Sequence, residues 1–118
     1  MKMTFIYDDK NNQVAYLFNQ LIISVTNNKL MGIILGHCVY GLQAKLVGTY
    51  FKEKIIDTKG ETIAELKTES TPDKLSFNKE SFITESWGMI RKIKEHFSPF
   101  VEEKLVWSKN NFIDILSM

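Results

Sequence analysis

The stretch Val14-Ala15-Tyr16-Leu17 returns three times in altered form, as Met31-Gly32-Ile33-Ile34, Val47-Gly48-Thr49-Tyr50 and Ile63-Ala64-Glu65-Leu66. Each copy begins with an apolar anchor residue, continues with Ala or Gly, and has a large apolar or aromatic residue three positions after the anchor. Successive anchors are 17, 16 and 16 residues apart. An aliphatic residue also stands about eight positions before each anchor: Ile6, Ile23, Val39 and Ile55.

A period of about sixteen residues is the length of one β-hairpin per repeat. The expected hairpin turns are the polar stretches 9–12, 26–29, 42–45 and 58–61, and the repeats are joined at 19–20, 36–37 and 52–54. Asn or Gly suits three of these turns because both residues accept a positive φ. The third turn has neither residue, and Gly41 before it is the expected source of a bend. The sequence therefore predicts eight short antiparallel strands in four hairpins.

The small residue after each anchor has two interpretations. Gly or Ala lets backbones approach closely, so we favour a crowded centre shared by the four repeats. The alternative is that these residues only mark β-bulges. In a regular strand the anchor and the residue three positions later point to opposite faces, and both are apolar here. We therefore expect both faces of the sheet to be covered near the anchors.

Periodicity changes after the fourth repeat. Residues 70–80 are predicted to form a polar linker around Pro72, and residues 81–118 a helical extension. Apolar residues then recur at helical spacing, at Phe82, Ile83, Trp87, Ile90, Ile93 and Phe97. We expect Trp87 and Phe97 to cover one face of the β-body, and Ser108 to cap a last short helix. The whole chain, 1–118, is read as one α+β domain in which the fourfold β-repeat spans 4–69.

The four repeat units resemble the four-fold beta-flower domains of small bacterial proteins. The resemblance covers roughly residues 4–69 and extends only loosely to the helical extension. It implies four hairpins arranged like petals about a pseudo-fourfold axis. It implies no activity, because the family offers no catalytic motif to transfer.

Composition narrows the functional class. The chain has 118 residues, of which 44% are hydrophobic and 25% charged, which is typical of a folded globular domain. Fifteen basic and fourteen acidic residues leave a net charge of +1, so no concentrated positive field for a nucleic-acid partner is expected. The longest apolar run, 30–35, is far shorter than the roughly 20 residues that span a bilayer, and no membrane association is expected. A single cysteine and the lack of a signal-peptide apolar core favour the cytoplasm.

Candidate catalytic and metal-binding residues are few. His37 and Cys38 are adjacent, but zinc sites need three or four ligands, and neighbouring strand residues point to opposite faces. A Cys38 nucleophile with His96 as base finds no supporting local motif, so Cys38 is read as a core residue. Asp8 and Asp57 occupy matching places beside hairpin turns, where the middle repeats carry Val25 and Gly41. We expect both carboxylates to bond the backbone. No catalytic residue, metal or cofactor is assigned.

The aromatic residues lead to the functional hypothesis. Half-exposed aromatic side chains are frequent in binding surfaces, and we predict one at Tyr50, His96 and Trp107. The leading function is a non-enzymatic module that binds a protein partner or a small ligand, and homodimerisation through an exposed edge strand or an uncovered sheet face is expected as a further possibility. The alternative is a small hydrolase or isomerase with a pocket near His96, Asp57 and Tyr50. An immunity or antitoxin-like protein is the third class.

Overall fold

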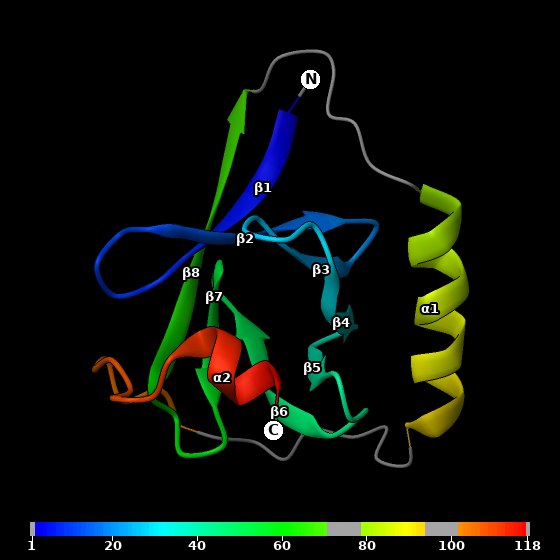
Figure 1. Cartoon of the computed structure of the whole chain (residues 1–118). Helices are drawn as coiled ribbons and strands as arrows, with labels where there is room; N and C mark the ends of the chain where they lie inside the picture. The colour runs from blue at the N-terminus through cyan, green and yellow to red at the C-terminus, as the bar shows by residue number, and fades with distance from the viewer. Residues whose placement is uncertain (1, 71–78, 94–101, 118) are drawn as a thin grey trace.

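The computed structural model describes residues 2–70, 79–93 and 102–117, which form a closed antiparallel barrel with two helices (Figure 1). Each strand pairs with the next one along the chain, and β8 returns to pair with β1. This confirms the eight antiparallel strands and four hairpins. The strands are β1 (Lys2–Tyr7), β2 (Gln13–Phe18), β3 (Leu21–Ser24), β4 (Leu30–Leu35), β5 (Cys38–Gly41), β6 (Leu46–Phe51), β7 (Lys54–Asp57) and β8 (Thr62–Ser70), and the helices are α1 (Lys79–Lys92) and α2 (Phe112–Leu116).

All four hairpins contain a β-bulge at the same place, on the anchor residue. In the first hairpin Ile6 pairs with Ala15 and Tyr7 pairs with Gln13, so the anchor Val14 has no partner of its own. The register slips in the same way in the other three hairpins. The extra residue shifts the alternation of side chains between the two faces of the sheet by one position. Val14 and Leu17 therefore both pack in the barrel interior. The expectation that the anchor and the residue three positions later lie on opposite faces is therefore wrong.

The small residue after each anchor follows a β-bulge in every hairpin, which is the alternative interpretation. Close backbone approach is seen at the two glycines, in each case against the neighbouring strand and not at a centre shared by the four repeats. A Cβ atom added to Gly32 would lie 2.5 Å from the carbonyl oxygen of Tyr40, and one added to Gly48 would lie closer still to the carbonyl oxygen of Ile56. Neighbouring hairpins are therefore packed backbone against backbone at these two positions.

The second hairpin departs from the predicted alignment. Its residue equivalent to Ile6 is Ile22, which pairs with Gly32, and not Ile23. The cause is a turn that is one residue longer: Ser24 N–H donates to Lys29 O, five positions on, whereas Asp8 N–H in the first hairpin donates to Asn12 O, four positions on. The longer turn moves the alignment by one position.

In the third turn the positive φ angle is adopted by Ala44, and not by the expected Gly41. Ala44 adopts a φ of 59°, the left-handed conformation that Asn11, Asn28 and Gly60 adopt in the other turns. Gly41 is needed for space and not for a bend, because an added Cβ would strike the backbone carbonyl of Leu116. The Leu42 N–H donates to that same carbonyl at 2.8 Å. Gly41 therefore makes room for the end of α2.

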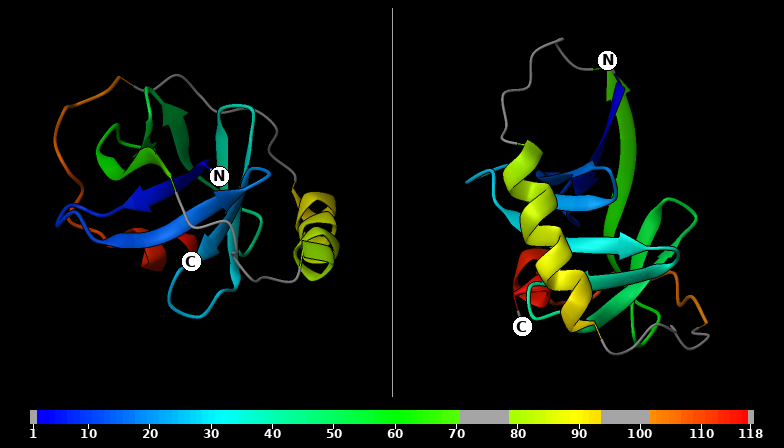
Figure 2. Two further views of the ribbon diagram at one scale, coloured as in Figure 1. Left: turned by 90° about the horizontal axis from the view of Figure 1, so that it is seen from above. Right: turned by 90° about the vertical axis from the view of Figure 1, so that its right-hand side faces the viewer.

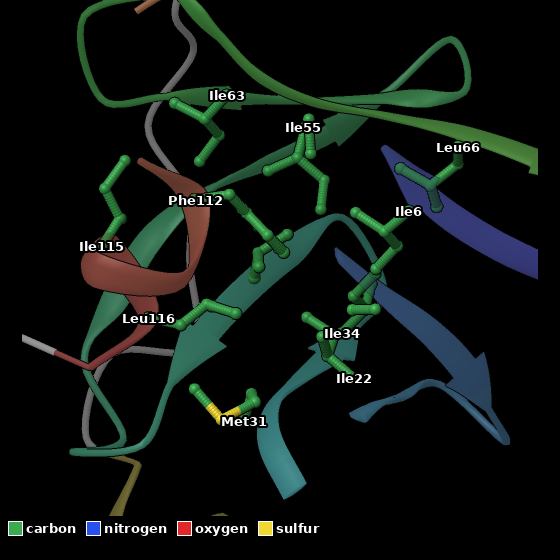
Figure 3. Packing of buried hydrophobic residues seen from close by; sticks show 13 residues of the cluster. Ile6, Ile22, Met31, Ile34, Ile55, Ile63, Leu66, Phe112, Ile115 and Leu116 are labelled. Carbon is green, nitrogen blue, oxygen red and sulfur yellow. The ribbon is translucent and has the colours of Figure 1, made fainter. Parts of the chain in front are cut away.

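The barrel interior has a central aliphatic layer, with the anchors and the residues three positions after them packed around it, and α2 covers one end. The layer consists of Ile6, Ile22, Val39 and Ile55, all 0% exposed. Phe112 of α2 projects toward this layer and is buried, as is Leu116 (Figure 3). Asn111 caps the helix, because its side-chain oxygen accepts a hydrogen bond of 2.9 Å from the Ile113 N–H. The tips of the hairpins and α2 therefore form the closed end of the barrel.

Helix α1 lies outside the barrel, beside β4 (Figure 2). It buries Phe82, Met89 and Ile93 in a second apolar cluster, which the outer faces of the strands complete. Trp87 is 56% exposed, so the prediction that it covers the β-body is wrong. Because positions 82, 86, 89 and 93 face the barrel, position 87 falls on another side of the helix. The helix is thus only partly amphipathic, since Ile83 is exposed as well.

The predicted linker and tail are described only in part. Ser70 still belongs to β8 and Lys79 already belongs to α1. Residues 71–78 lie outside the described residues, as do Phe97 and His96. The division of the chain at 69, 80 and 81 stays a prediction.

Candidate functional site

The end of the barrel opposite α2 carries a pocket of about 210 Å³, which we call the mouth pocket. Its lining includes the residue three positions after the anchor in all four repeats: Leu17, Ile34, Tyr50 and Leu66. Figure 3 shows Ile34 and Leu66 on the side of the core away from α2. The remaining lining residues are Thr4, Gln20, Gly36, Glu53 and Thr68. The pocket therefore lies where the four repeats converge.

Short turns between the repeats hold the rim of the mouth pocket. Two-residue turns with positive φ occur at Asn19-Gln20 and at Lys52-Glu53. Each turn is bonded to a strand of the following repeat. The Ile34 N–H donates to Gln20 O at 2.9 Å, and the Leu66 N–H donates to Glu53 O at 2.8 Å. Tyr50 is held in the same way, since its N–H donates to His37 O at 2.8 Å.

The fourth corner of the mouth pocket differs from the other three. Here β1 and β8 continue beyond the rest of the barrel as a two-stranded ribbon (Figure 1). Thr4 and Thr68 pair across this ribbon, and their hydroxyl oxygens lie 3.0 Å apart. Since both threonines line the pocket, this side offers hydroxyl groups above the apolar floor.

The mouth pocket combines an apolar floor with a polar rim that has one formal charge. Ile34 and Leu66 are buried, whereas Leu17 and Tyr50 are half-buried. Glu53 is exposed and is the only Asp, Glu, Lys, Arg or His among the lining residues. The other polar side chains of the lining are uncharged: the amide of Gln20, the hydroxyl groups of Thr4 and Thr68, and the phenol of Tyr50.

The three residues predicted to form a binding surface do not share one pocket in the described structure. Tyr50 lines the mouth pocket. Trp107 forms a parallel bridge with Thr62, where the Thr62 N–H donates to Val106 O at 2.8 Å and the Ser108 N–H donates to Thr62 O at 2.8 Å. It is not among the residues that line the mouth pocket. His96 lies outside the described residues, and the binding roles of all three stay predictions.

Asp57 lines a different pocket from Tyr50. This second pocket, of about 340 Å³, lies between the hairpin tips and α2, and its lining also includes Lys45, Lys59 and Ile115. The Asp57 carboxylate accepts hydrogen bonds of 2.9 Å from the Lys59 and Glu61 N–H groups. The alternative pocket near His96, Asp57 and Tyr50 is therefore not assembled among the described residues.

Asp8 has the same role in the first turn, which confirms that both carboxylates bond the backbone. Its Oδ1 accepts from the Asn12 N–H at 2.8 Å and from the Lys10 N–H at 3.0 Å. The bond from Asn12 is the main cause that lowers the pKa of Asp8. The equivalent residue of the second repeat is Ser24, whose hydroxyl accepts from the Thr26 N–H at 3.2 Å, and not Val25.

His37 and Cys38 face different surroundings. His37 is exposed in the turn before β5, whereas Cys38 is buried in the cluster beneath α1. Among residues 2–70, 79–93 and 102–117, no three His, Cys, Asp or Glu side chains are grouped so that they could hold a metal ion.

Several mouth residues were missed as site residues in the sequence. Leu17, Ile34 and Leu66 were recognised as repeat positions, but a regular strand would place them on the face opposite to the anchors. The bulge brings both sets into one interior. Gln20 and Glu53 stood in predicted connections, and their matching positions in adjacent repeats were the available signal.

A sequence profile of the family described as 4-fold beta flower protein matches residues 4–116, and the chain belongs to this family. The match continues through both helices, whereas the resemblance seen in the sequence covers only about residues 4–69. No curated protein and no solved structure is significantly similar to the chain. Neither helix in the described part of the chain has the length and apolar character needed to cross a membrane.

Proposed function

We propose that this protein is a non-enzymatic binding module whose ligand enters the mouth pocket. The observation that carries the proposal is the convergence of the four repeats on the mouth pocket. The equivalent residues Leu17, Ile34, Tyr50 and Leu66 all line it, at the end of the barrel that α2 does not cover, whereas the pocket beside α2 is lined by hairpin-tip residues and by α2. Small barrels usually fill their interior with their own side chains, so an open end is a natural place for a ligand.

The size of the mouth pocket suits a small molecule or one side chain of a protein partner. At roughly 30 Å³ for each water molecule, its volume of about 210 Å³ corresponds to about seven waters. Leu17 and Tyr50 remain half-buried, and a ligand that covers them gains the free energy of removing apolar surface from water.

The enzymatic alternative has less support. Tyr50 and Asp57 line separate pockets, and the Asp57 carboxylate is engaged by two backbone N–H groups of its own turn. A general base needs a carboxylate that can reach the substrate proton. We also place the protein in a reducing compartment, most simply the cytoplasm, because its single cysteine, Cys38, is free.

The proposal can be tested by filling the mouth pocket. Leu17→Trp puts a larger side chain into the pocket, and Leu42→Trp places the same residue on an exposed hairpin tip as a control. A library of small fragments is screened by amide chemical shifts of the ¹⁵N-labelled protein. Fragments should shift the amides of Ile34, Tyr50 and Leu66 in wild type and in Leu42→Trp, and not in Leu17→Trp. The proposal is wrong if no fragment shifts these amides, or if Leu17→Trp binds as wild type does.

A further inference from the structure

We infer that the mouth pocket binds a primary alkylammonium group, an inference that rests on the binding function proposed above. The apolar stem of such a ligand would lie on Leu17, Ile34 and Leu66, and its ammonium group would lie at the rim beside Glu53. The side chain of a lysine in a protein partner and a free alkylamine share this chemistry.

The charge at the rim is the first argument. The two lysines that flank Glu53 in the sequence are both engaged elsewhere. The Lys52 ammonium lies 5.1 Å from the centre of the Phe51 ring, and the Lys54 ammonium forms an ion pair of 2.5 Å with Glu103. Among the described residues, the Glu53 carboxylate forms no ion pair. A cationic ligand would therefore meet a negative charge that the protein has not neutralised.

The arrangement of acceptors is the second argument. An ammonium group has three hydrogen-bond donors and no acceptor, so it needs several oxygen atoms around it. The rim provides the Glu53 carboxylate, the Gln20 amide oxygen and the hydroxyl groups of Thr4 and Thr68. Tyr50 adds an aromatic ring, and aromatic faces attract cations.

The size and polarity of the pocket favour a linear stem. Ile34 and Leu66 are buried at its floor, whereas Gln20, Glu53 and Thr68 are exposed. A ligand that matches this order has an apolar end and a cationic end. A stem of four or five carbons fits within a volume of about 210 Å³, the equivalent of about seven waters.

The experiment compares three probes by amide chemical shifts: n-pentylammonium, the neutral isostere 1-pentanol, and Nα-acetyl-lysine N-methylamide, which mimics a lysine in a chain. Glu53→Gln removes the rim charge, and Glu61→Gln is the matched control, because Glu61 follows the fourth hairpin turn and does not line the mouth pocket. We expect n-pentylammonium to bind about two- to fivefold more tightly than 1-pentanol, which is the range of a solvent-exposed charge pair. Glu53→Gln should abolish that preference without weakening 1-pentanol, and Glu61→Gln should keep it.

The possible results separate the two proposals. Equal binding of n-pentylammonium and 1-pentanol at the mouth amides, or a preference that survives Glu53→Gln, overturns the ammonium inference and leaves the binding function intact. Failure of all three probes to shift the mouth amides also overturns the inference, and the fragment screen then decides the binding function alone. Tight binding of the lysine mimic would assign the ligand to a protein partner, and binding of n-pentylammonium alone would assign it to a free amine.

Discussion

Two Gly→Ala substitutions should change the stability of this protein in opposite directions. At Gly48 the φ angle is not positive, so alanine is compatible with the backbone conformation, and only space is at issue. An added Cβ would overlap the carbonyl oxygen of Ile56 and lie 3.2 Å from its carbonyl carbon. Both atoms belong to the backbone of a closed barrel, so a strand has to move. At Gly88, in the middle of α1, an added Cβ meets nothing within 4 Å.

The magnitudes follow from these surroundings. Inserting a methyl group into a packed interior typically costs about 1–3 kcal/mol. Gly48→Ala should therefore lower the free energy of unfolding by about 1–3 kcal/mol. Gly88→Ala should raise it by about 1 kcal/mol, because alanine is that much better than glycine in a helix interior.

Urea unfolding followed by circular dichroism provides the measurement. The midpoint should fall for Gly48→Ala and rise for Gly88→Ala, with similar m-values, because neither change alters the surface exposed on unfolding by much. Ala15→Gly serves as a control at the equivalent small position of the first repeat, where a methyl group is already accommodated and fully buried. It should destabilise the protein through loss of that methyl group. A Gly48→Ala variant as stable as wild type would refute the view that close backbone approach requires glycine at this position.

Two further outcomes are expected. Phe112→Ala should lower the free energy of unfolding by about 3–5 kcal/mol, because it leaves a cavity where α2 covers the barrel. Val106→Ala, at a 50% exposed position, is the control and should change the free energy of unfolding by less than about 0.5 kcal/mol. Equal effects of the two variants in urea unfolding would contradict the role of α2 in closing the barrel. Asp8→Asn should destabilise the protein at pH 7, because hydrogen bonds to the carboxylate lower the pKa of folded Asp8. The difference should begin to shrink near pH 4, about the usual pKa of an aspartate, and be lost as the pH falls through the lower pKa of the folded state. A difference that is constant from pH 7 to pH 3 would contradict this origin.

The strand order could be predicted because it depends on local features of the sequence, namely the turn residues and the spacing of the anchors. Turn residues such as Asn11, Asn28 and Gly60 mark hairpins wherever they stand, and the spacing of the anchors gives the length of each hairpin. Which residues of each strand face the barrel interior could not be predicted in the same way. A bulge at Val14 depends on the pairing of two strands, and the apolar residues on its two sides look the same in sequence as residues on opposite faces.

For helix α1, too, the presence of a helix could be predicted from the sequence, but the face that it buries could not. Helical spacing from Phe82 to Phe97 predicts a helix, and the structure describes one at Lys79–Lys92. The apolar residues at 82, 83, 87, 90 and 93 nevertheless span more than one face. Packing on the barrel selects Phe82, Met89 and Ile93, and leaves Trp87 exposed. Of the residues that line the mouth pocket, the sequence singled out only Tyr50 as a candidate, because an aromatic side chain stands out in a sequence, whereas Leu17 and Leu66 come together only when the barrel closes.

The internal repeat offers a way to separate residues that the fold requires from residues that it leaves free. Four copies of one hairpin meet the same structural demands within one chain. The innermost layer has nearly the same residue type in every repeat, because each of these side chains fills the equivalent interior position: Ile6, Ile22, Val39 and Ile55.

The three turns between the repeats differ in their second residue. This residue is Gln20, then His37, then Glu53, of which Gln20 and Glu53 line the mouth pocket. In all three turns the backbone carbonyl of this residue accepts the bond that holds the rim, from the N–H of Ile34, Tyr50 or Leu66. The fold therefore uses only the main chain at these positions. Their side chains are free to differ, so the barrel itself does not require a carboxylate at position 53, and Glu53→Gln should leave the fold intact.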